Sequence, residues 1–271
     1  MTPPESAWTP PRATGRVDAV RDVDELIEEA ARADVSGWDF TWLDGRATEE
    51  RPPWGYARLM AERLAGASAA LDLDTGRGEV LAEAPSLPPR TCATEGWPPN
   101  LERARRLLSP RGVQVVTAVP GEPMPFPDAA FDLVTSRHPV DPPWPEIARV
   151  LADGGTYLAQ HVGPASAFEL IEYFLGPLPR QRLARDPRAE AQAARAAGLD
   201  VVDLRTARCR MEFHDVGAVV YVLRTCVWWV PDFTVDRYRD ALVRLDARLR
   251  SDGPFVAHST RHLIDARRRA R

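Results

Sequence analysis

The strongest constraint on the fold is an alternation of short apolar segments with helical segments along the middle of the chain. Strands that alternate with helices build a parallel sheet with helices on both faces. Helical periodicity is clear in N-L-E-R-A-R-R-L-L, which separates two of the apolar segments. The sequence therefore predicts an α/β fold. The predicted strands of its first five βα steps are 69–74, 90–95, 112–118, 131–136 and 156–162.

Helical additions are predicted on both sides of this core. An aromatic-rich N-terminal segment contains W-D-F-T-W and P-P-W-G-Y, and two further helices interrupt the pattern before a last strand. We expect the two additions to form one lid over an apolar or aromatic substrate, although ordinary helix packing also explains most of these aromatics. The predicted parts are a helical extension (1–65), a core (66–214), a helical insertion (215–253), and a last strand with a basic tail (254–271).

The first predicted strand runs into a glycine-containing turn, L-D-L-D-T-G-R-G-E. Gly76 and Gly78 allow a sharp turn and a close approach of the backbone to a ligand. Glu95 ends the next strand 19 residues after Gly76, a spacing at which an acidic residue accepts hydrogen bonds from ribose hydroxyls. The third glycine of a dinucleotide fingerprint is missing, which argues against NAD or FAD. The turn predicts a cofactor that contains a nucleoside.

Four motifs in order resemble those of class I S-adenosyl-L-methionine (SAM) dependent methyltransferases, of the kind called methyltransferase type 11. They are D-L-D-T-G-R-G-E, A-T-E-G-W, G-E-P-M-P-F-P-D-A-A-F-D-L-V and R-V-L-A-D-G-G-T-Y, and the resemblance covers roughly residues 66 to 162. It implies a Rossmann-like, mostly parallel seven-stranded sheet that binds SAM. These motifs are specific for the cofactor and not for the substrate.

The resemblance also implies roles for individual residues. Asp72 would orient the turn and lie with Asp74 near the methionine amino group, and Glu95 would hold the ribose hydroxyls. Trp97 could pack on the adenine. The implied cofactor-binding residues are Asp72, Asp74, Thr75, Gly76, Gly78, Glu95, Gly96, Trp97, Gly121, Glu122 and Ser136.

Two positions depart from the family pattern. Asp74 stands where the motif has its first glycine, and Pro120 stands where an acidic residue often contacts the adenine amine. The second departure could weaken recognition of the adenine, and neither excludes SAM.

Candidate catalytic residues follow the fourth strand, because ligands bind at the carboxyl ends of strands in such sheets. His138 is the first candidate for a general base, since an unperturbed imidazole titrates near neutral pH. A loop histidine bonded to the backbone is the alternative. Arg137 could bind a carboxylate or phosphate of the substrate, or form a structural ion pair. His161 is expected to be structural.

The pair His258 and His262 forms H-x-x-x-H, a spacing that can hold a metal on a helix. The pair falls in or just after a predicted strand, no third ligand is evident, and methyl transfer needs no metal. No metal site is therefore expected.

The most conspicuous short motif is D-P-P-W-P at 141–145. It matches the Asp-Pro-Pro-aromatic tetrad of enzymes that methylate the exocyclic amine of adenine. In those enzymes the Asp directly follows the fourth strand, whereas here it lies five residues beyond Ser136. We therefore expect a loop that leads into the helix W-P-E-I-A-R-V-L, with Asp141 and the prolines as helix starters.

Composition narrows the class of function. A net charge of -4 argues against a nucleic-acid partner. Three widely spaced cysteines predict no disulfide framework. The longest apolar stretch, 216–230, contains Arg224 and is too short to span a bilayer, and the start lacks a signal peptide.

The sequence therefore predicts a cytoplasmic SAM-dependent methyltransferase that acts on an O or N nucleophile of a small molecule. An RNA or DNA base methyltransferase and a non-catalytic SAM-binding protein are the alternatives.

Overall fold

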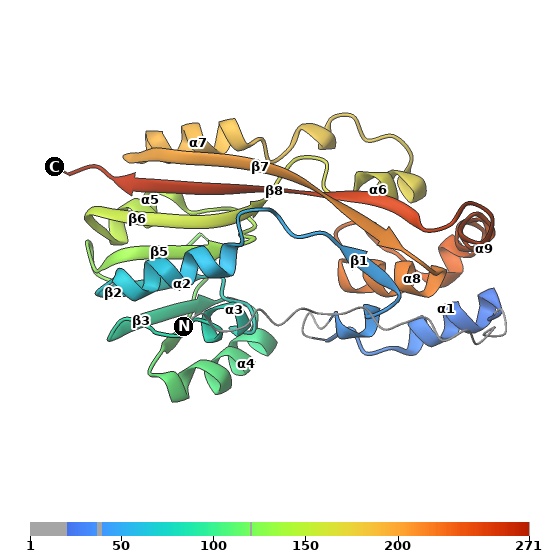
Figure 1. Cartoon of the computed structure of the whole chain (residues 1–271), viewed down its shortest axis with the longest axis horizontal. Helices are drawn as coiled ribbons and strands as arrows, with labels where there is room; N and C mark the ends of the chain where they lie inside the picture. The colour runs from blue at the N-terminus through green and yellow to red at the C-terminus, as the bar shows by residue number, and fades with distance from the viewer. Residues whose placement is uncertain (1–20, 37–39, 120, 271) are drawn as a thin grey trace, which may run out of the picture.

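One mixed β-sheet organises the computed structural model, which describes residues 21–36, 40–119 and 121–270 (Figure 1). Its eight strands follow the order β1-β7-β8-β6-β5-β2-β3-β4. The strands are β1 (Ala47–Glu49), β2 (Ala69–Leu73), β3 (Arg90–Glu95), β4 (Gln114–Thr117), β5 (Phe131–Arg137), β6 (Leu151–Val162), β7 (Leu199–Phe213) and β8 (Phe255–Arg268).

The strands β4, β3, β2, β5 and β6 are parallel neighbours, and β8 pairs antiparallel with both β6 and β7. The predicted α/β sheet is confirmed. The short strand β1 adds to the outer edge of β7 and makes eight strands where the resemblance implied seven.

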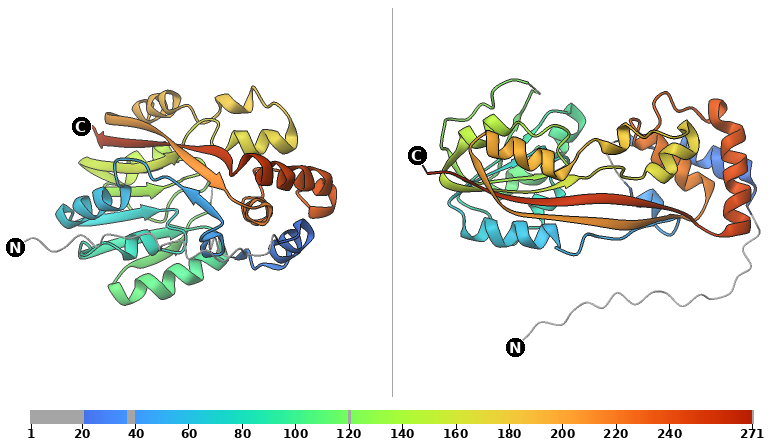
Figure 2. Two further views of the ribbon diagram at one scale, coloured as in Figure 1. Left: turned by 45° about the vertical axis from the view of Figure 1, so that its right-hand side comes forward. Right: turned by 90° about the horizontal axis from the view of Figure 1, so that it is seen from above.

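Helices cover both faces of the parallel part of the sheet (Figures 1 and 2). Alternate residues of β2 show the two sides: Leu71 packs in the core beneath α5, and Ala70 packs in the core beneath α2 and α4. One face carries α2 (Tyr56–Gly66), α3 (Glu79–Ala82) and α4 (Pro98–Leu108), and the other carries α5 (Trp144–Val150) and α7 (Pro187–Ala196).

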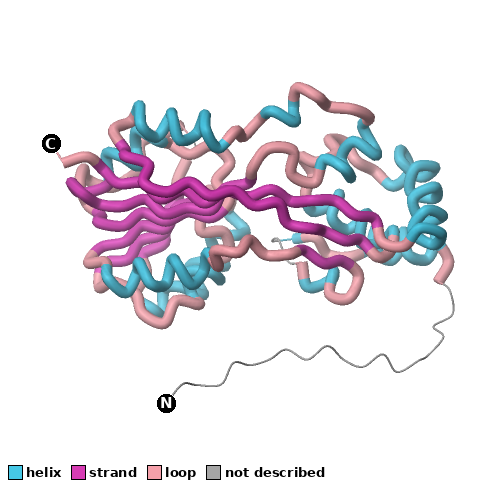
Figure 3. Tube along the Cα trace, turned by 45° about the horizontal axis from the view of Figure 1, so that its top comes forward, coloured by secondary structure: helices cyan, strands magenta, loops and turns pink. Residues whose placement is uncertain are grey.

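The last two strands run far beyond the rest of the sheet. At the carboxyl end of β6, Val162 pairs with Arg261, but β7 and β8 continue to pair as far as Phe213 and Phe255. Figure 3 shows this two-stranded ribbon leaving the main sheet without a break. Because β6 is parallel to the other core strands, the ribbon projects past their carboxyl ends, where the site is expected.

Four helices pack around the projecting ribbon and form a core of their own, which we call the helical module. Ile27, Leu170, Val219 and Leu245 are all buried in it against Phe255. Its helices are α1 (Val23–Arg32), α6 (Phe168–Leu175), α8 (Val216–Thr225) and α9 (Val235–Asp252). Single 3-10 turns lie at Thr41–Leu43, Ser109–Arg111 and Gln181–Leu183.

The N-terminal segment and the predicted insertion meet in this helical module. Trp42 stacks on Tyr221 at 4.7 Å between ring centroids, and Phe233 stacks on Tyr238 at 5.6 Å. Trp42, Tyr221, Trp229 and Phe233 are therefore packing residues of the helical module, whereas Phe40 and Trp228 are exposed. None of the helices in the described ranges combines the length and the apolar character needed to cross a membrane.

Two local expectations need correction. The predicted strand 156–162 begins earlier, at Leu151, so α5 ends at Val150, and the pairing of β6 with β5 shifts register between Phe131 and Leu133. Trp54, expected in the lid, is 4% exposed and lies in the core under α2. The strands β7 and β8 belong to both the core and the helical module, so no linker separates the two.

A bidentate ion pair holds the edge strand β1 against the helical module. Arg46 donates from Nε to Oδ2 of Asp215 at 2.8 Å and from a terminal nitrogen to Oδ1 at 2.8 Å. Oδ1 also accepts the N–H of Ala218 at 2.9 Å and so caps α8. Both side chains are largely buried, and a second carboxylate, that of Glu29, lies farther from the guanidinium at 3.4 Å.

We predict that Asp215→Ala lowers the free energy of unfolding by about 2–4 kcal/mol, since it removes a helix cap and the closer of the two carboxylates that pair with the largely buried Arg46. The matched control is Asp186→Ala, which removes the exposed cap of α7. That variant should cost about 1 kcal/mol. Urea unfolding measures both, and equal losses would contradict a special role for the Arg46–Asp215 pair.

Candidate active site

A strained turn at the end of β2 begins the site. Asp74, Gly76 and Gly78 have φ angles of 52°, 63° and 88°. Asp tolerates this left-handed region better than most residues, which explains why it can replace the glycine of the motif. At Gly78 a Cβ would lie 2.8 Å from the Leu108 side chain, so only glycine fits. The turn is anchored to β3, because the N–H of Thr75 donates to the Thr94 carbonyl at 2.9 Å.

Glu95 lies at the end of β3, directly beside this turn. It is 8% exposed, and its Oε1 accepts the N–H of Trp97 at 2.7 Å. Burial raises the pKa of Glu95, and backbone hydrogen bonds from Trp97, Gly76 and Gly96 oppose the shift. The hydrogen bonds from Asp74 and Thr75 to Thr94, the residue before Glu95, show that the structure joins the two motifs that the 19-residue spacing paired in the sequence.

The ring of Trp97 is 42% exposed at the start of α4. Just before it, a Cβ on Gly96 would lie 2.9 Å from the Ala118 carbonyl, so the loop after β4 lies close against this turn. Gly121 and Glu122 are exposed on the same loop. The structure thus presents an open aromatic surface next to Glu95. Pro120, the second departure from the family pattern, lies outside the described residues.

Two of the predicted cofactor residues are instead occupied within the sheet. Asp72 accepts the hydroxyl of Thr135 at 2.6 Å, and burial raises its pKa to about 6. The side chain of Ser136 is buried and donates to the Leu73 carbonyl at 3.1 Å. Asp72 therefore stabilises the sheet beneath the Gly76–Gly78 turn. Ser136 can contact a cofactor only through its backbone.

His138 takes part in a chain of three side chains after β5. The indole N–H of Trp54 donates to Oε1 of Gln160 at 2.8 Å, and Nε2 of Gln160 lies 3.0 Å from Nε2 of His138. An indole nitrogen can only donate, so it fixes which end of the Gln160 amide is oxygen. The amide NH₂ therefore donates to His138, and Nε2 of that imidazole must be unprotonated.

The charge state of His138 agrees with this arrangement. Burial lowers its pKa well below the usual value, and the nearby charges of Arg137 and Arg261 lower it further. The neutral ring then carries its proton on Nδ1 and offers a donor there. Its basic nitrogen Nε2 becomes available only when Gln160 moves away, which constrains the predicted role as a general base.

Arg137 ends β5 with an exposed side chain. Across the described ranges no hydrogen bond or ion pair engages its guanidinium, so the predicted structural ion pair is not formed there. Arg261 lies near enough to affect the same histidine, but it is paired with Glu49 at 2.8 Å. Arg137 is therefore a cation at this edge that is open to a ligand.

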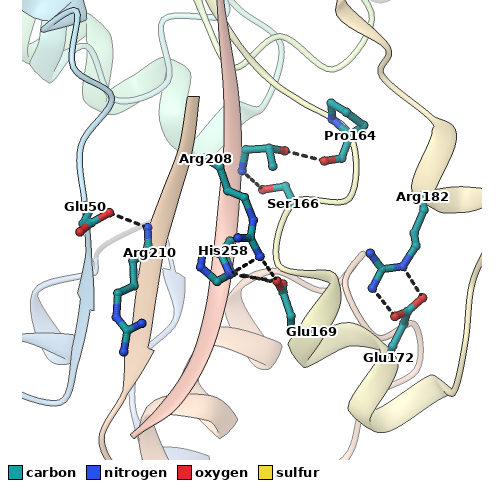
Figure 4. A network of polar contacts seen from close by, with 10 residues as sticks. Glu50, Pro164, Ser166, Glu169, Glu172, Arg182, Arg208, Arg210 and His258 are labelled. Carbon is teal, nitrogen blue, oxygen red and sulfur yellow. Dashed lines mark hydrogen bonds and ion pairs between the residues drawn. The ribbon is translucent and has the colours of Figure 1, made fainter. Parts of the chain in front are cut away.

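The pair H-x-x-x-H does not come together, because residues four apart on a strand are separated by about 13 Å. His258 contacts Glu169 at 2.9 Å and Arg208 at 2.7 Å, as Figure 4 shows. His262 instead contacts Glu190 at 2.9 Å. His161 also contacts Glu190, at 2.5 Å, and burial lowers the pKa of this imidazole.

The aromatic ring of the D-P-P-W motif is buried and does not line the site. Trp144 is 8% exposed and packs edge-on against Tyr157 at 5.5 Å. The helix α5 begins at Trp144 with Pro143 as its N-cap, so the loop interpretation fits but Asp141 is not the cap. A ring buried in this way offers no face on which a base could stack.

Comparisons with known proteins agree with the methyltransferase fold. Residues 71–159 match the family model described as a methyltransferase domain. No curated protein matches the sequence. The structure is similar to a proposed methyltransferase from Bacillus halodurans C-125, with a TM-score of 0.57 and 19% identity over 80% of this chain and 99% of that one.

Two further solved structures share the fold. The YcgJ protein from Bacillus subtilis has a TM-score of 0.53 and 19% identity, over 80% of this chain and 99% of its own. The [4+2]-cyclase SpnF also has a TM-score of 0.53, with 17% identity over 92% of this chain and 93% of its own. At these identities the likeness establishes the fold, and the cyclase shows that this fold also carries other chemistry.

We predict that His138 is neutral and protonated on Nδ1 at about pH 6, below the ordinary histidine pKa of about 6.5. Gln160→Glu replaces the amide donor with an acceptor, so it should raise the pKa of His138 and move the proton to Nε2. Nitrogen-15 NMR of the imidazole ring measures both, with His138→Gln identifying the signal. A doubly protonated wild-type ring at that pH would contradict the arrangement.

Proposed function

We propose that this protein is a SAM-dependent methyltransferase, because residues 71–159 match the model of the methyltransferase domain family and the sheet has the class I architecture. Its acceptor is the O or N nucleophile of a small molecule. The observation that carries the proposal is the closure of the glycine turn onto Glu95, with the open face of Trp97 beside it.

The residues present fit a nucleoside cofactor. Glu95 is an ionisable acceptor for ribose hydroxyls, Trp97 offers a face for the adenine, and Gly76 leaves open space where a Cβ would stand. SAM supplies an electrophilic methyl group on a sulfonium when it is bound. Asp74 is exposed at the same turn and provides a carboxylate for the methionine amino group.

Arg137 and His138 would bind and orient the acceptor at the end of β5. An open guanidinium and a neutral imidazole with an Nδ1 donor suit an anionic oxygen, such as a carboxylate. Methyl transfer depends mainly on aligning the nucleophile with the methyl group and excluding water. An acceptor that arrives deprotonated needs no base. For a protonated acceptor, His138 could take the proton after Gln160 releases Nε2.

The helical module would cover this acceptor. It stands on the ribbon that projects past the carboxyl ends of the core strands, so it lies on the side where the methyl group would be transferred. This position supports the lid hypothesis, and it gives the module a means of excluding water.

Two alternative functions, methylation of a nucleic-acid base and SAM binding without catalysis, can be distinguished from the proposed one. Methylation of a nucleic-acid base finds little support, because the ring of the D-P-P-W motif is buried and the net charge is -4. Release of S-adenosylhomocysteine during incubation with SAM and a panel of small carboxylic acids and amines would establish catalysis. A protein that binds SAM but methylates nothing would be the non-catalytic alternative.

We predict that the protein binds S-adenosylhomocysteine and that Glu95→Ala weakens this binding by about 10- to 100-fold, the effect of losing a hydrogen bond to a charged group. Isothermal titration calorimetry measures both affinities. The control is Glu83→Ala, which removes an exposed carboxylate at the far end of α3 and should leave the affinity unchanged. Absence of binding by the folded wild type would overturn the cofactor assignment.

A further inference from the structure

A second cluster of chemically active side chains lies on the face of the sheet that α5 and α7 cover. His161 is next to last in β6, His262 comes from β8, and Glu190 comes from α7. We propose that these three side chains bind one divalent transition-metal ion, and that Zn²⁺ fits them best.

The positions follow from the pairing of the strands. His161 and His262 stand directly opposite each other on antiparallel β6 and β8, so their side chains leave the same face. Their ring centroids are 4.9 Å apart. Glu190 reaches both rings from above, and the three possible ligand atoms all lie within 4.8 Å of one another.

The donor set is one that zinc prefers. Two imidazole nitrogens and one carboxylate oxygen are typical ligands, and an open fourth position takes water. Around a tetrahedral zinc the ligand atoms stand about 3.3 Å apart. Nδ1 of His161 and Nε2 of His262 lie 2.5 and 2.9 Å from the same Glu190 oxygen. A retreat of this flexible, 18%-exposed side chain by about 1 Å would therefore admit the ion.

The surroundings support ligation over a simple hydrogen-bond cluster. The other nitrogen of His161 lies 3.0 Å from the Tyr157 hydroxyl, which would hold the ring as a metal ligand is usually held. His262 is 0% exposed, and within the described residues its Nδ1 has no partner. A metal bond at Nε2 would add a strong interaction for this fully buried ring, while Nδ1 would keep its proton without an acceptor.

Such an ion would join α7 to the two strands at the carboxyl edge. Gln160, which holds His138, directly precedes His161 on β6 and points to the opposite face. The ion would therefore hold the carboxyl end of β6 in place, and with it Gln160, which contacts His138. It would not contact the cofactor or the acceptor.

The test uses the untagged full-length protein, stripped with a chelator and dialysed. Titration with zinc chloride and elemental analysis should show one zinc per chain. Glu190→Gln removes the charge at a partly exposed helix position that the fold tolerates, and it should weaken zinc binding at least about 10-fold. His262→Gln should do the same. The matched control is His258→Gln, which should keep the affinity of the wild type.

The melting temperature with and without zinc distinguishes a loss of zinc binding from a loss of folding. Zinc should raise the melting temperature of the wild type and of His258→Gln, and it should leave that of Glu190→Gln nearly unchanged. Failure of the folded wild type to bind zinc would overturn the proposal, as would equal zinc affinity in the wild type and Glu190→Gln. Neither result would bear on SAM binding, because none of the three side chains belongs to the cofactor-binding residues Gly76, Gly78, Glu95 and Trp97.

Discussion

The pairing of β7 with β8 is the interaction on which the rest of the structure depends. It runs from Leu199 opposite Arg268 to Phe213 opposite Phe255. One half of this ribbon completes the edge of the parallel sheet, and the other half carries the core of the helical module. Because the ladder continues from the sheet into the helical module, swinging the module away would break backbone hydrogen bonds, and the pairing therefore holds it over the carboxyl ends of the core strands. The edge where ligands bind in such folds is thus built from both parts.

Two networks of buried polar side chains, one on each face of the sheet, lie at this carboxyl edge. On one face Trp54 orients Gln160, and Gln160 fixes the tautomer of His138. On the other face the neighbouring residue His161 meets His262 and Glu190. Each network satisfies groups that would be costly to bury alone, and each uses the alternation of side chains along β6. Two adjacent residues of one strand therefore serve two separate sites.

The core of the fold and the cofactor turn could be predicted from the sequence because their signals are local. The strand ends, Gly76, Gly78 and Glu95 lie within short motifs, and the structure brings them together. The length of β7 and β8 could not be predicted in the same way, because the ribbon is rich in arginine and pairs with distant residues. The burial of Trp54 was missed for a similar reason. Its partner Gln160 lies 106 positions away, and only the fold brings them together. The cross-strand partner of His262, His161, is equally non-local, so the H-x-x-x-H spacing gave no sign of it.

The most direct test of the central claim is a crystal structure of the protein with S-adenosylhomocysteine. We expect the ribose hydroxyls on Glu95, the adenine against Trp97, and the sulfur facing Arg137 and His138 on the side covered by the helical module. A ligand bound away from the Gly76–Gly78 turn would contradict this account. A sulfur that faces the α5 and α7 side of the sheet would contradict it equally.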